Sequence, residues 1–382
     1  MTSNKKILIV TADTGGGHRS AAEAIAEAMH QLYDETCRVE IANAWADHTP
    51  FPINRLSQLY GPLVNRGAIL WKLIFHSTSN RRGMNFLVNI FWPAIRKSME
   101  DFLRQSNPDV VVSVHPVLTY FSIRALQETN LRIPFVTVVT DLVSLHPLWL
   151  CPKTDFCLVP TEPARERALA NGLPHEKVKV VGLPVGLKFA GGVGDKGTLR
   201  DQLGLERDRP TILVVGGGEG MGKVYKIARA IAKARVNAQL MVVAGRNKRL
   251  QRRLHKVDWE IPTTVFGFVN NMPELMGASD VIVTKAGPST ISEALITGLP
   301  ILLSGFVPGQ EEGNVEYVIN KGVGTWAEKP QRIADTLAQW LRPGNETLTH
   351  MAQKAQRLGR PRAALDIAAE IFSLAQANSS ST

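Results

Sequence analysis

The chain has 382 residues, of which 44% are hydrophobic, and a formal net charge of +10. This length exceeds what one ordinary core holds, so two domains of roughly 150 to 200 residues are expected. No zinc-finger, RRM or helix-turn-helix pattern accompanies the positive charge, and the sequence therefore indicates no nucleic-acid partner. The three cysteines, Cys37, Cys151 and Cys157, form no CxxC pair, which excludes a disulfide framework or a zinc site of the usual spacing.

We expect neither a secretion signal nor a membrane span. The apolar run at residues 7–12 is short and leads into a Gly-rich turn, and no uninterrupted apolar stretch of about 18 residues follows. Basic residues gather in two segments: eleven Lys and Arg without an acidic residue at 223–256, and eight against two acidic residues at 50–105. Such clusters favour anionic lipid or a phosphate-bearing substrate, with a solvated helix face as the alternative. We expect a cytoplasmic protein that associates peripherally with the membrane.

Short β-branched runs alternate with helical patterns, which is typical of a parallel sheet. The first series of expected strands is Lys5–Ala12, Val39–Ala42, Asp109–Val114, Pro134–Thr140, Phe156–Val159 and Val178–Val181. The second series is Thr211–Val215, Leu240–Ala244, Thr263–Phe266, Asp280–Thr284 and Pro300–Ser304. Helices are expected at Ser20–His30, Val224–Ala234 and Thr290–Thr297. The prediction is an α/β protein of two doubly wound units that face a central cleft.

Glycine marks the boundary between the two units. Five glycines crowd into residues 187–204 with little apolar periodicity, which indicates an interdomain linker. The expected domains are therefore residues 1–186 and 205–360. A last helix, with proline at its first position, is expected over residues 361–377, and residues 378–382 are expected to be disordered.

Residues 51–103 break the alternation of strands and helices. Large apolar and aromatic side chains are mixed there with Arg and Lys. They are Tyr60, Leu63, Leu70, Trp71, Leu73, Ile74, Phe75, Phe86, Leu87, Ile90, Phe91 and Trp92. The mixture predicts an amphipathic surface that lies on a membrane, with packing of part of these side chains against the first sheet as the alternative.

A Gly-rich turn follows the first expected strand. Gly16 and Gly17, preceded by Gly15, let the backbone approach a ligand closely, and the following helix N-terminus offers free N–H groups to an anion or an oxygen. His18 then lies at the edge of the cleft. A neutral imidazole is suited to take a proton from an alcohol, and a structural role is the alternative for a single histidine.

The second domain opens with a strand and a run of glycines. Their spacing fails the dinucleotide fingerprint, and Val224 replaces the Ser or Thr that holds magnesium in a Walker A loop. What remains is a turn at Gly217 and Gly218 that suits a diphosphate, or simply a tight turn. No Asp-x-Asp pair occurs in the chain, so we expect neither a metal site nor a cofactor.

A later strand end leads into a helix with polar groups at its start. Gly287, Pro288, Ser289 and Thr290 open this helix, whose N-terminal donors suit phosphates. Glu293 lies about one turn further on, where a carboxylate can accept from two ribose hydroxyls.

The loop after the next strand carries an amide and carboxylates. Gln310 and Glu311 are expected outside any core, where they suit a sugar with several hydroxyls. Solvated surface is the alternative for the carboxylates.

Several motifs together carry a resemblance to a known family. They are GGGHR at 15–19, SVHP at 113–116, TD at 140–141 with HPLW at 146–149, KAGPST at 285–290 and PGQEEGN at 308–314. Over residues 7–324 the chain resembles glycosyltransferase family 28, and within it the monogalactosyldiacylglycerol synthases and processive diacylglycerol glucosyltransferases. The resemblance implies a GT-B fold of two Rossmann-like domains, an inverting single displacement without a metal, and a donor bound mostly by the C-terminal domain.

The resemblance also implies roles for individual residues. The donor positions are Phe268 and Val269 for uracil, Glu293 for ribose, Gly287 to Thr290 for the diphosphate, and Gln310 with Glu311 for the hexose. His18 matches the proposed base, and Asp141 is the second candidate base or orients His18 or the acceptor. His115 is expected to serve the acceptor, with a structural role as the alternative, and His146 lies beside the expected acceptor. Residues 51–103 match the region that meets lipid.

One segment departs from the family pattern. Residues 142–145 read LVSL, where plant-type galactosyl enzymes have small and polar residues, so the sugar is expected only as a hexose, galactose or glucose. The expected reaction transfers it from a UDP-hexose to diacylglycerol at an anionic membrane surface. The alternatives are a UDP-GlcNAc transferase acting on a polyprenyl-linked lipid, and a non-catalytic module that binds nucleotide sugar or anionic lipid.

Overall fold

The computed structural model describes residues 4–12, 16–59 and 67–379. Asp13, Thr14 and Gly15 of the first glycine turn, Tyr60 and Leu63 of the basic segment, and residues 380–382 of the tail lie outside the described residues. The chain divides into two compact units. The first comprises Met1–Leu187, Val307–Gln310 and Arg362–Thr382, and the second Lys188–Phe306 and Glu311–Pro361.

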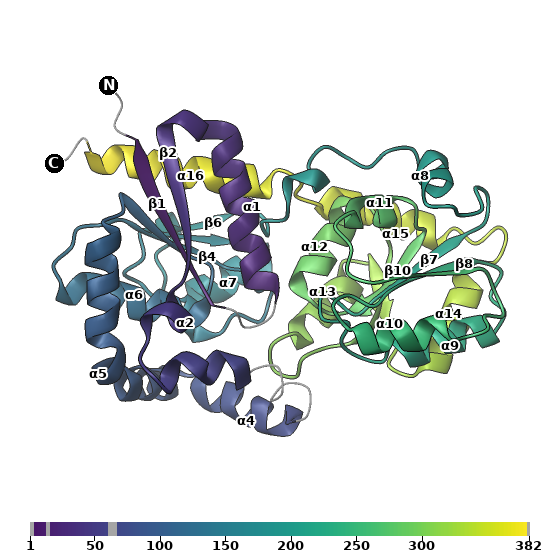
Figure 1. Cartoon of the computed structure of the whole chain (residues 1–382), viewed down its shortest axis with the longest axis horizontal. Helices are drawn as coiled ribbons and strands as arrows, with labels where there is room; N and C mark the ends of the chain where they lie inside the picture. The colour runs from purple at the N-terminus through teal and green to yellow at the C-terminus, as the bar shows by residue number, and fades with distance from the viewer. Residues whose placement is uncertain (1–3, 13–15, 60–66, 380–382) are drawn as a thin grey trace. The chain divides into compact units, whose positions relative to one another are not determined.

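The first unit is built on a six-stranded parallel sheet of order β2-β1-β3-β4-β5-β6 (Figure 1). Its strands are β1 (Lys5–Thr11), β2 (Cys37–Asn43), β3 (Val110–Ser113), β4 (Phe135–Val138), β5 (Phe156–Val159) and β6 (Val178–Val180). The chain runs outward from β1 to β2 and then returns to place β3 on the other side of β1. The carboxyl ends of β1 and β3 therefore form the switch point at which such sheets bind ligands.

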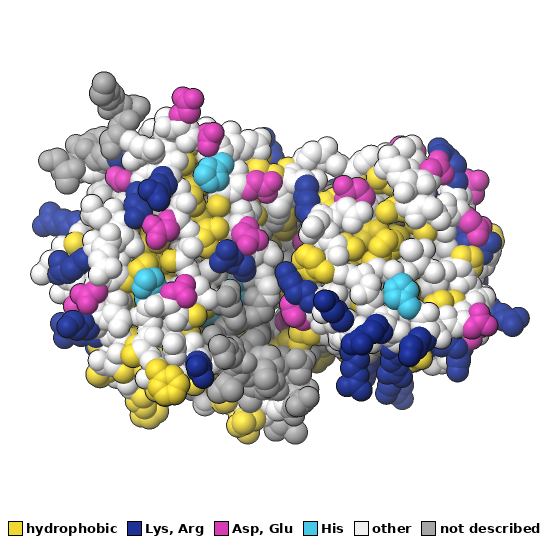
Figure 2. Space-filling view, in the orientation of Figure 1, with side chains coloured by type: hydrophobic (Ala, Val, Ile, Leu, Met, Phe, Trp, Pro, Cys, Tyr) yellow, Lys and Arg dark blue, Asp and Glu magenta, His cyan; other side chains and the backbone are white. Residues whose placement is uncertain are grey.

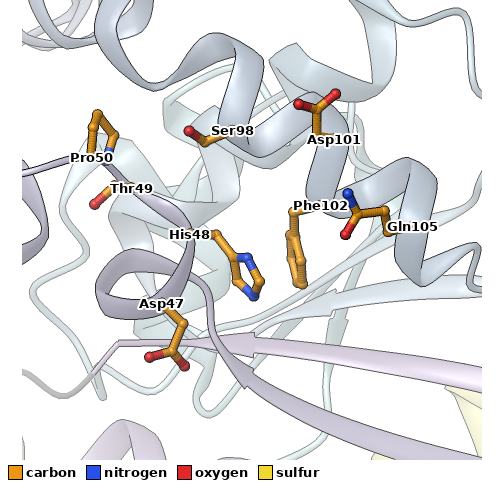
Figure 3. Close-up of a pocket in the computed structure, with 8 residues that line it drawn as sticks. All are labelled: Asp47, His48, Thr49, Pro50, Ser98, Asp101, Phe102 and Gln105. Carbon is orange, nitrogen blue, oxygen red and sulfur yellow. The ribbon is translucent and has the colours of Figure 1, made fainter.

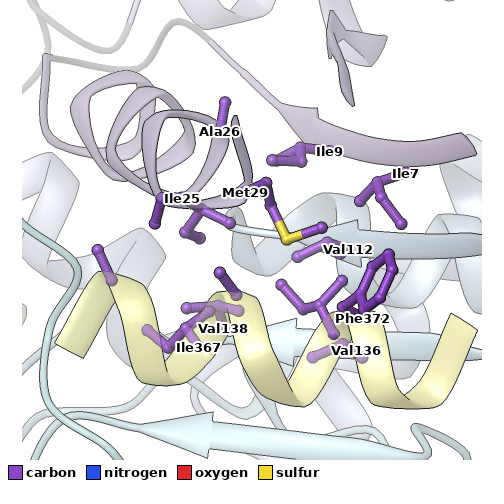
Figure 4. Close-up of a cluster of buried hydrophobic side chains, with 14 of the residues drawn as sticks. Ile7, Ile9, Ile25, Ala26, Met29, Val112, Val136, Val138, Ile367 and Phe372 are labelled. Carbon is purple, nitrogen blue, oxygen red and sulfur yellow. The ribbon is translucent and has the colours of Figure 1, made fainter. Parts of the chain in front are cut away.

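Helices cover both faces of this sheet. They are α1 (Gly16–Tyr33), α2 (Ala44–His48), α4 (Ala68–Thr78), α5 (Arg81–Ser106), α6 (Pro116–Glu128), α7 (Glu162–Ala170) and α16 (Ala363–Ser379). Ile7 and Ile9 of β1 are buried in the core that α1 and α16 cover (Figure 4), and Leu8 and Val10 in the core that α5 and α6 cover. Burial on both faces explains why the strands read as continuous apolar runs.

The second unit repeats the plan with a parallel sheet of order β12-β11-β10-β7-β8-β9. Its strands are β7 (Thr211–Val215), β8 (Gln239–Val243), β9 (Thr263–Phe266), β10 (Val281–Lys285), β11 (Ile301–Gly305) and β12 (Gly324–Trp326). Its helices are α8 (Lys196–Gln202), α9 (Val224–Lys233), α10 (Lys248–His255), α11 (Met272–Gly277), α12 (Pro288–Ile296), α13 (Glu312–Asn320), α14 (Pro330–Trp340) and α15 (Thr347–Leu358). The switch point here lies between β7 and β10.

The two doubly wound α/β units are confirmed, and the eleven expected strands lie within two residues of their expected ends. The sequence did not indicate β12, because a strand of three residues is too short to show a period. The expected linker contains α8, whose Asp195 N-cap accepts from the backbone N–H of Thr198 at 2.9 Å. Arg200 of α8 pairs with Asp280 at 2.6 Å, which anchors this helix in the second unit.

The last helix belongs to the first unit. Helix α16 packs beside α1, and its Glu370 pairs with Lys179 of β6 at 2.7 Å. It runs to Ser379, two residues into the segment that was expected to be disordered.

The apolar side chains of α4 and α5 divide into two sets. Met84, Val88 and Trp92 of α5 are buried in the first unit's core. Others are exposed: Leu70 (54%), Leu73 (63%), Ile74 (40%), Phe86 (68%) and Ile90 (55%). Within the described part of the chain, no helix has the length and apolar character needed to span a bilayer.

Candidate active site

His18 lies at the switch point of the first sheet. Helix α1 begins at Gly16 instead of Ser20, so His18 is in its first turn and not in a preceding loop. His115, which follows β3 and precedes α6, lies against it with ring centroids 4.7 Å apart in an edge-on arrangement. His115 is buried, and burial together with the neighbouring His18 holds the pKa of His115 well below its ordinary value.

The hydrogen bonds of His18 define its tautomer. Its Nδ1 lies 2.9 Å from the carbonyl oxygen of Val114 and 2.9 Å from Oγ1 of Thr140. Because a carbonyl oxygen only accepts, Nδ1 carries the proton and donates. Burial lowers the pKa of His18 to about 4, against a smaller opposing effect of the Val114 bond. The ring is therefore neutral at physiological pH, and Nε2 holds the lone pair.

Asp141 lies in a second polar cluster beside this pair. Its Oδ2 accepts from the indole N–H of Trp149 at 2.7 Å, and its Oδ1 lies 3.4 Å from Nε2 of Gln310. The Trp149 ring is also 6.1 Å from that of His18. Gln310, expected among the donor residues, thus belongs to the first unit, as does Gly309, which approaches Phe75 of α4.

His146 links a loop to α4. Its Nδ1 accepts from the backbone N–H of Leu148 at 3.2 Å, so Nε2 carries the proton and donates to Oγ1 of Thr78 at 3.1 Å. The Phe75 ring packs edge-on against it at 5.1 Å. Burial lowers the pKa of His146 to about 4. With both nitrogens engaged in this way, His146 positions α4 and is not placed to exchange protons with a substrate.

The glycine run of the second unit forms a tight turn after β7. Gly217 has φ +71°, which favours glycine, and Gly220 donates back to the Gly217 carbonyl at 3.0 Å. The Gly218 carbonyl accepts from the backbone of Arg246 at 2.8 Å. The Arg246 guanidinium lies 4.1 Å from the centre of the Phe268 ring, which is 51% exposed, so Phe268 presents an aromatic surface beside a cation and Val269 follows it half-buried.

The segment after β10 carries a buried ion pair. Lys285 at the end of β10 contacts Oε1 of Glu311 at 2.5 Å, and Glu311 is only 5% exposed. The alternative that this carboxylate is solvated surface is therefore wrong, because a lysine 26 residues away compensates its charge. Asn314 of α13 donates to the Ala286 carbonyl at 2.9 Å, which fixes the segment that leads into α12.

Helix α12 begins where the diphosphate was expected. Gly287 is its N-cap, and Pro288, Ser289 and Thr290 form the first turn, whose N–H groups have no partner within the helix. Glu293 follows in the second turn and is half-buried. Burial raises the pKa of Glu293 to about 7, and nearby Lys188 opposes that rise.

A pocket of about 250 Å³ lies elsewhere in the first unit, between α2 and α5 (Figure 3). His48 stacks on Phe102 there, with ring centroids 4.0 Å apart. The lining residues are Asp47, His48, Thr49, Pro50, Ser98, Asp101, Phe102 and Gln105. None of these is an expected site residue, and no cluster of metal-ligand type occurs within the described ranges.

Comparison with known sequences identifies the family. The profile described as monogalactosyldiacylglycerol (MGDG) synthase matches residues 18–185, and the glycosyltransferase family 28 C-terminal domain matches residues 211–367. Monogalactosyldiacylglycerol synthase 1, chloroplastic, of Arabidopsis thaliana is 41% identical over 98% of this chain and 72% of its own length. The chain belongs to the monogalactosyldiacylglycerol synthase family. The spinach synthase is likewise 41% identical, over 97% of this chain and 73% of its own length.

Membership of the monogalactosyldiacylglycerol synthase family makes the chain an enzyme, a hexosyltransferase. Solved structures of low identity show the fold alone. The Acinetobacter baumannii MurG structure has a TM-score of 0.65 at 18% identity, covering 97% of this chain and 99% of its own. The Staphylococcus aureus MnaA–UDP structure has a TM-score of 0.63 at 17% identity, covering 95% and 94%. The GT-B fold that the resemblance implied is confirmed.

Two groups of expected site residues emerge in this synthase-family chain, one in each unit. The first contains Gly16, Gly17, His18, His115, Asp141, His146 and Gln310, and the second Gly217, Gly218, Phe268, Val269, Gly287, Pro288, Ser289, Thr290, Glu293 and Glu311. No role was predicted for Thr140, Trp149, Arg246 or Lys285, which the structure places in these groups. Thr140, Trp149 and Lys285 lie inside the motifs quoted above, and this position in the sequence was the signal by which they could have been found.

Proposed function

We propose that this chain transfers galactose from UDP-galactose to the free hydroxyl of diacylglycerol, with inversion at the anomeric carbon. Family membership and the names of the relatives support the sugar and the acceptor. The observation that carries the mechanism is His18, whose Nδ1 donates to the Val114 carbonyl and leaves Nε2 unprotonated.

In this reaction the acceptor oxygen attacks the anomeric carbon of the donor. Nε2 of His18 takes the hydroxyl proton as the new glycosidic bond forms. The bond between the anomeric carbon and the diphosphate oxygen breaks, and UDP leaves with its electron pair. The lowered pKa of His18 keeps Nε2 unprotonated at physiological pH, which is the form that a general base needs. A pKa of about 4 also makes the ring a weaker proton acceptor, so the proton moves only as the new bond forms. Asp141, engaged by Trp149, acts as a positioning residue and not as the base.

The second unit supplies the donor site in this proposal. Phe268 and Val269 hold uracil, and Glu293 accepts from the ribose hydroxyls. The α12 N-terminus and Lys285 stabilise the negative charge that develops on the leaving diphosphate. The ion pair of Lys285 with buried Glu311 supports this assignment, because it holds the ammonium group in one place beside Gly287, whose added Cβ would lie 3.0 Å from Nζ.

The first unit supplies the lipid contact. The exposed apolar side chains of α4 and α5, such as Leu73 and Phe86, are suited to enter the outer part of a bilayer next to the basic residues of the same segment. Thr78 at the end of α4 is bonded to His146, so this apolar surface is tied to the loop that also carries Asp141 and Trp149. The enzyme then meets its acceptor without leaving the membrane surface.

The test is product analysis with the purified protein. Diacylglycerol in anionic vesicles is incubated with UDP-galactose, UDP-glucose or UDP-GlcNAc, with and without EDTA, and the lipid product is examined for sugar and anomeric configuration. The proposal expects β-galactosyldiacylglycerol from an α-linked donor, at a rate that EDTA leaves unchanged. Product from UDP-glucose alone would change the sugar, and product only from UDP-GlcNAc with a polyprenyl acceptor would overturn the proposal.

A further inference from the structure

Helix α10 and its C-cap residue expose five cations to solvent. Leu254 is fully buried and Leu250 half-buried, and this pair, four residues apart, forms the inner stripe of the helix. Opposite this stripe the helix and its C-cap expose a set of five Lys and Arg side chains, which we call the basic face. They are Lys248, Arg249, Arg252, Arg253 and Lys256.

Nearby carboxylates neutralise other cations of the segment and leave the basic face uncompensated. Glu260 forms an ion pair with Arg229 at 2.7 Å, and Glu219 forms one with Arg246 at 3.2 Å. Among the described residues, the ion pairs include none with a member of the basic face. Figure 2 shows Lys and Arg side chains gathered over the part of the second unit that carries α9 and α10. Five like charges on two helical turns repel one another, so the surface favours an anionic partner.

The aromatic rings near the basic face are covered by guanidinium groups. Arg253 lies 3.6 Å from the centre of the Tyr225 ring of α9, and Arg229 lies 5.5 Å from that of Trp259. Single-stranded nucleic acid is held by stacking its bases on open aromatic faces, and these two rings have a face occupied. The surface is therefore suited to a partner recognised by charge alone.

We propose that the basic face of α10 binds the surface of an anionic phospholipid bilayer. The inference rests on the proposed function, because an enzyme that glycosylates diacylglycerol works at a bilayer, and it adds a contact from the second unit that makes no use of inserted apolar side chains. Lys and Arg are drawn to the headgroup layer of anionic lipid, each contributing a roughly fivefold gain in binding. The phosphate charges of the lipid supply the counter-ions that the basic face lacks.

The experiment measures vesicle binding of the full chain by co-sedimentation. The triple variant R249Q/R252Q/K256Q is compared with the wild type on vesicles of phosphatidylcholine alone and of phosphatidylcholine with about a third phosphatidylglycerol. We expect the variant to bind the anionic vesicles about a hundredfold more weakly at low salt, because three roughly fivefold contributions are lost together. Raising the salt to about 0.5 M should remove most of the difference, because it screens exposed charges.

A matched control removes the same charge from other helices of the same unit. Lys329, Lys354 and Arg357 are exposed residues at the start of α14 and on α15, and the variant K329Q/K354Q/R357Q should change binding by less than about twofold. Both variants should keep wild-type turnover of diacylglycerol in neutral detergent micelles, which shows that they fold and that the catalytic groups are intact.

Equal loss in the two variants would overturn the proposal, because net charge and not the basic face would then govern binding. Wild-type binding of the vesicles by R249Q/R252Q/K256Q would also overturn it. The same holds if this variant loses binding to a short RNA but keeps its binding to the vesicles. Vesicle binding is measured without turnover. Absence of any glycolipid product would therefore contradict the proposed function, while the binding comparison would still test this inference.

Discussion

The indole N–H of Trp149 donates to Oδ2 of Asp141 at 2.7 Å, and both side chains are buried. The other carboxylate oxygen lies 3.4 Å from the side-chain amide nitrogen of Gln310. A carboxylate whose two oxygens face donors is fixed in orientation. Asp141 therefore has a positioning role in the proposed mechanism, and proton transfer falls to His18.

Substitution of Asp141 separates these roles. Asp141→Ala removes the acceptor of a buried indole N–H and should lower the free energy of unfolding by about 1–3 kcal/mol. Asp141→Asn keeps an oxygen acceptor, so its kcat should stay within about tenfold of the wild type. Thermal unfolding and turnover check the pair. An Asp141→Asn variant with intact folding and negligible turnover would mean that the carboxylate itself is the base.

Thr140 should help to hold the reactive tautomer of His18. Thr140→Val keeps the shape but removes the oxygen that lies 2.9 Å from Nδ1, a contact of about 1 kcal/mol. We expect kcat to fall about threefold to fivefold with the KM for the donor unchanged, and the nitrogen NMR shifts of His18 to move toward a mixture of tautomers. Thr140→Ser should restore both, and failure of the serine variant to do so would argue against the role of the hydroxyl.

Stability should fall with acid because of the buried histidines. The pKa of His146 is about 4 in the folded chain against an ordinary value near 6.5, so between these pH values the unfolded chain binds the proton and the folded chain does not. The free energy of unfolding should therefore drop by about 2 kcal/mol between pH 7 and pH 5 from His146 alone. Denaturant titrations of His146→Gln should show a smaller drop. The exposed His30, changed to Gln, serves as the control, and an equal effect of both would contradict the assignment.

Lys285 should contribute to donor binding as well as to the ion pair with Glu311. Lys285→Met leaves Glu311 buried without its cation and should cost about 3–5 kcal/mol of stability, with a donor KM at least about tenfold higher. The double variant Lys285→Met/Glu311→Gln should recover stability without recovering the KM. Titration with UDP, together with thermal unfolding, distinguishes the two effects. Recovery of donor binding in the double variant would show that Lys285 serves only the fold.

Local patterns were sufficient for most of the fold. The strand β7 and the helix α9 that follows it lie almost where they were expected, because β7 is a fully buried apolar run and α9 buries one regular face. The short strand β12 and the helix α8 were missed. In α8 the surrounding glycines hid an N-cap at Asp195, whose bond to Thr198 is a local signal that composition outweighed.

The sequence indicated where the site residues lie along the chain, but not which residues they contact in the fold. The glycine turn located His18, but its tautomer is set by the carbonyl oxygen of Val114, which is 96 residues away in the sequence. The loop after β11 located Glu311, but its burial depends on Lys285 of another strand. Such long-range pairs follow from sheet order, which a single sequence does not specify, so polar groups were assigned to surface that the fold in fact encloses.

In the proposed mechanism His18 takes the proton of the acceptor, and hexose transfer by the His18→Ala variant is the decisive measurement. The rate of transfer to diacylglycerol in anionic vesicles is measured beside UDP binding and beside the exposed-site control His30→Ala. We expect a loss of about 10²–10⁴ in kcat with UDP affinity and folding unchanged. Transfer by His18→Ala at close to the wild-type rate would contradict it.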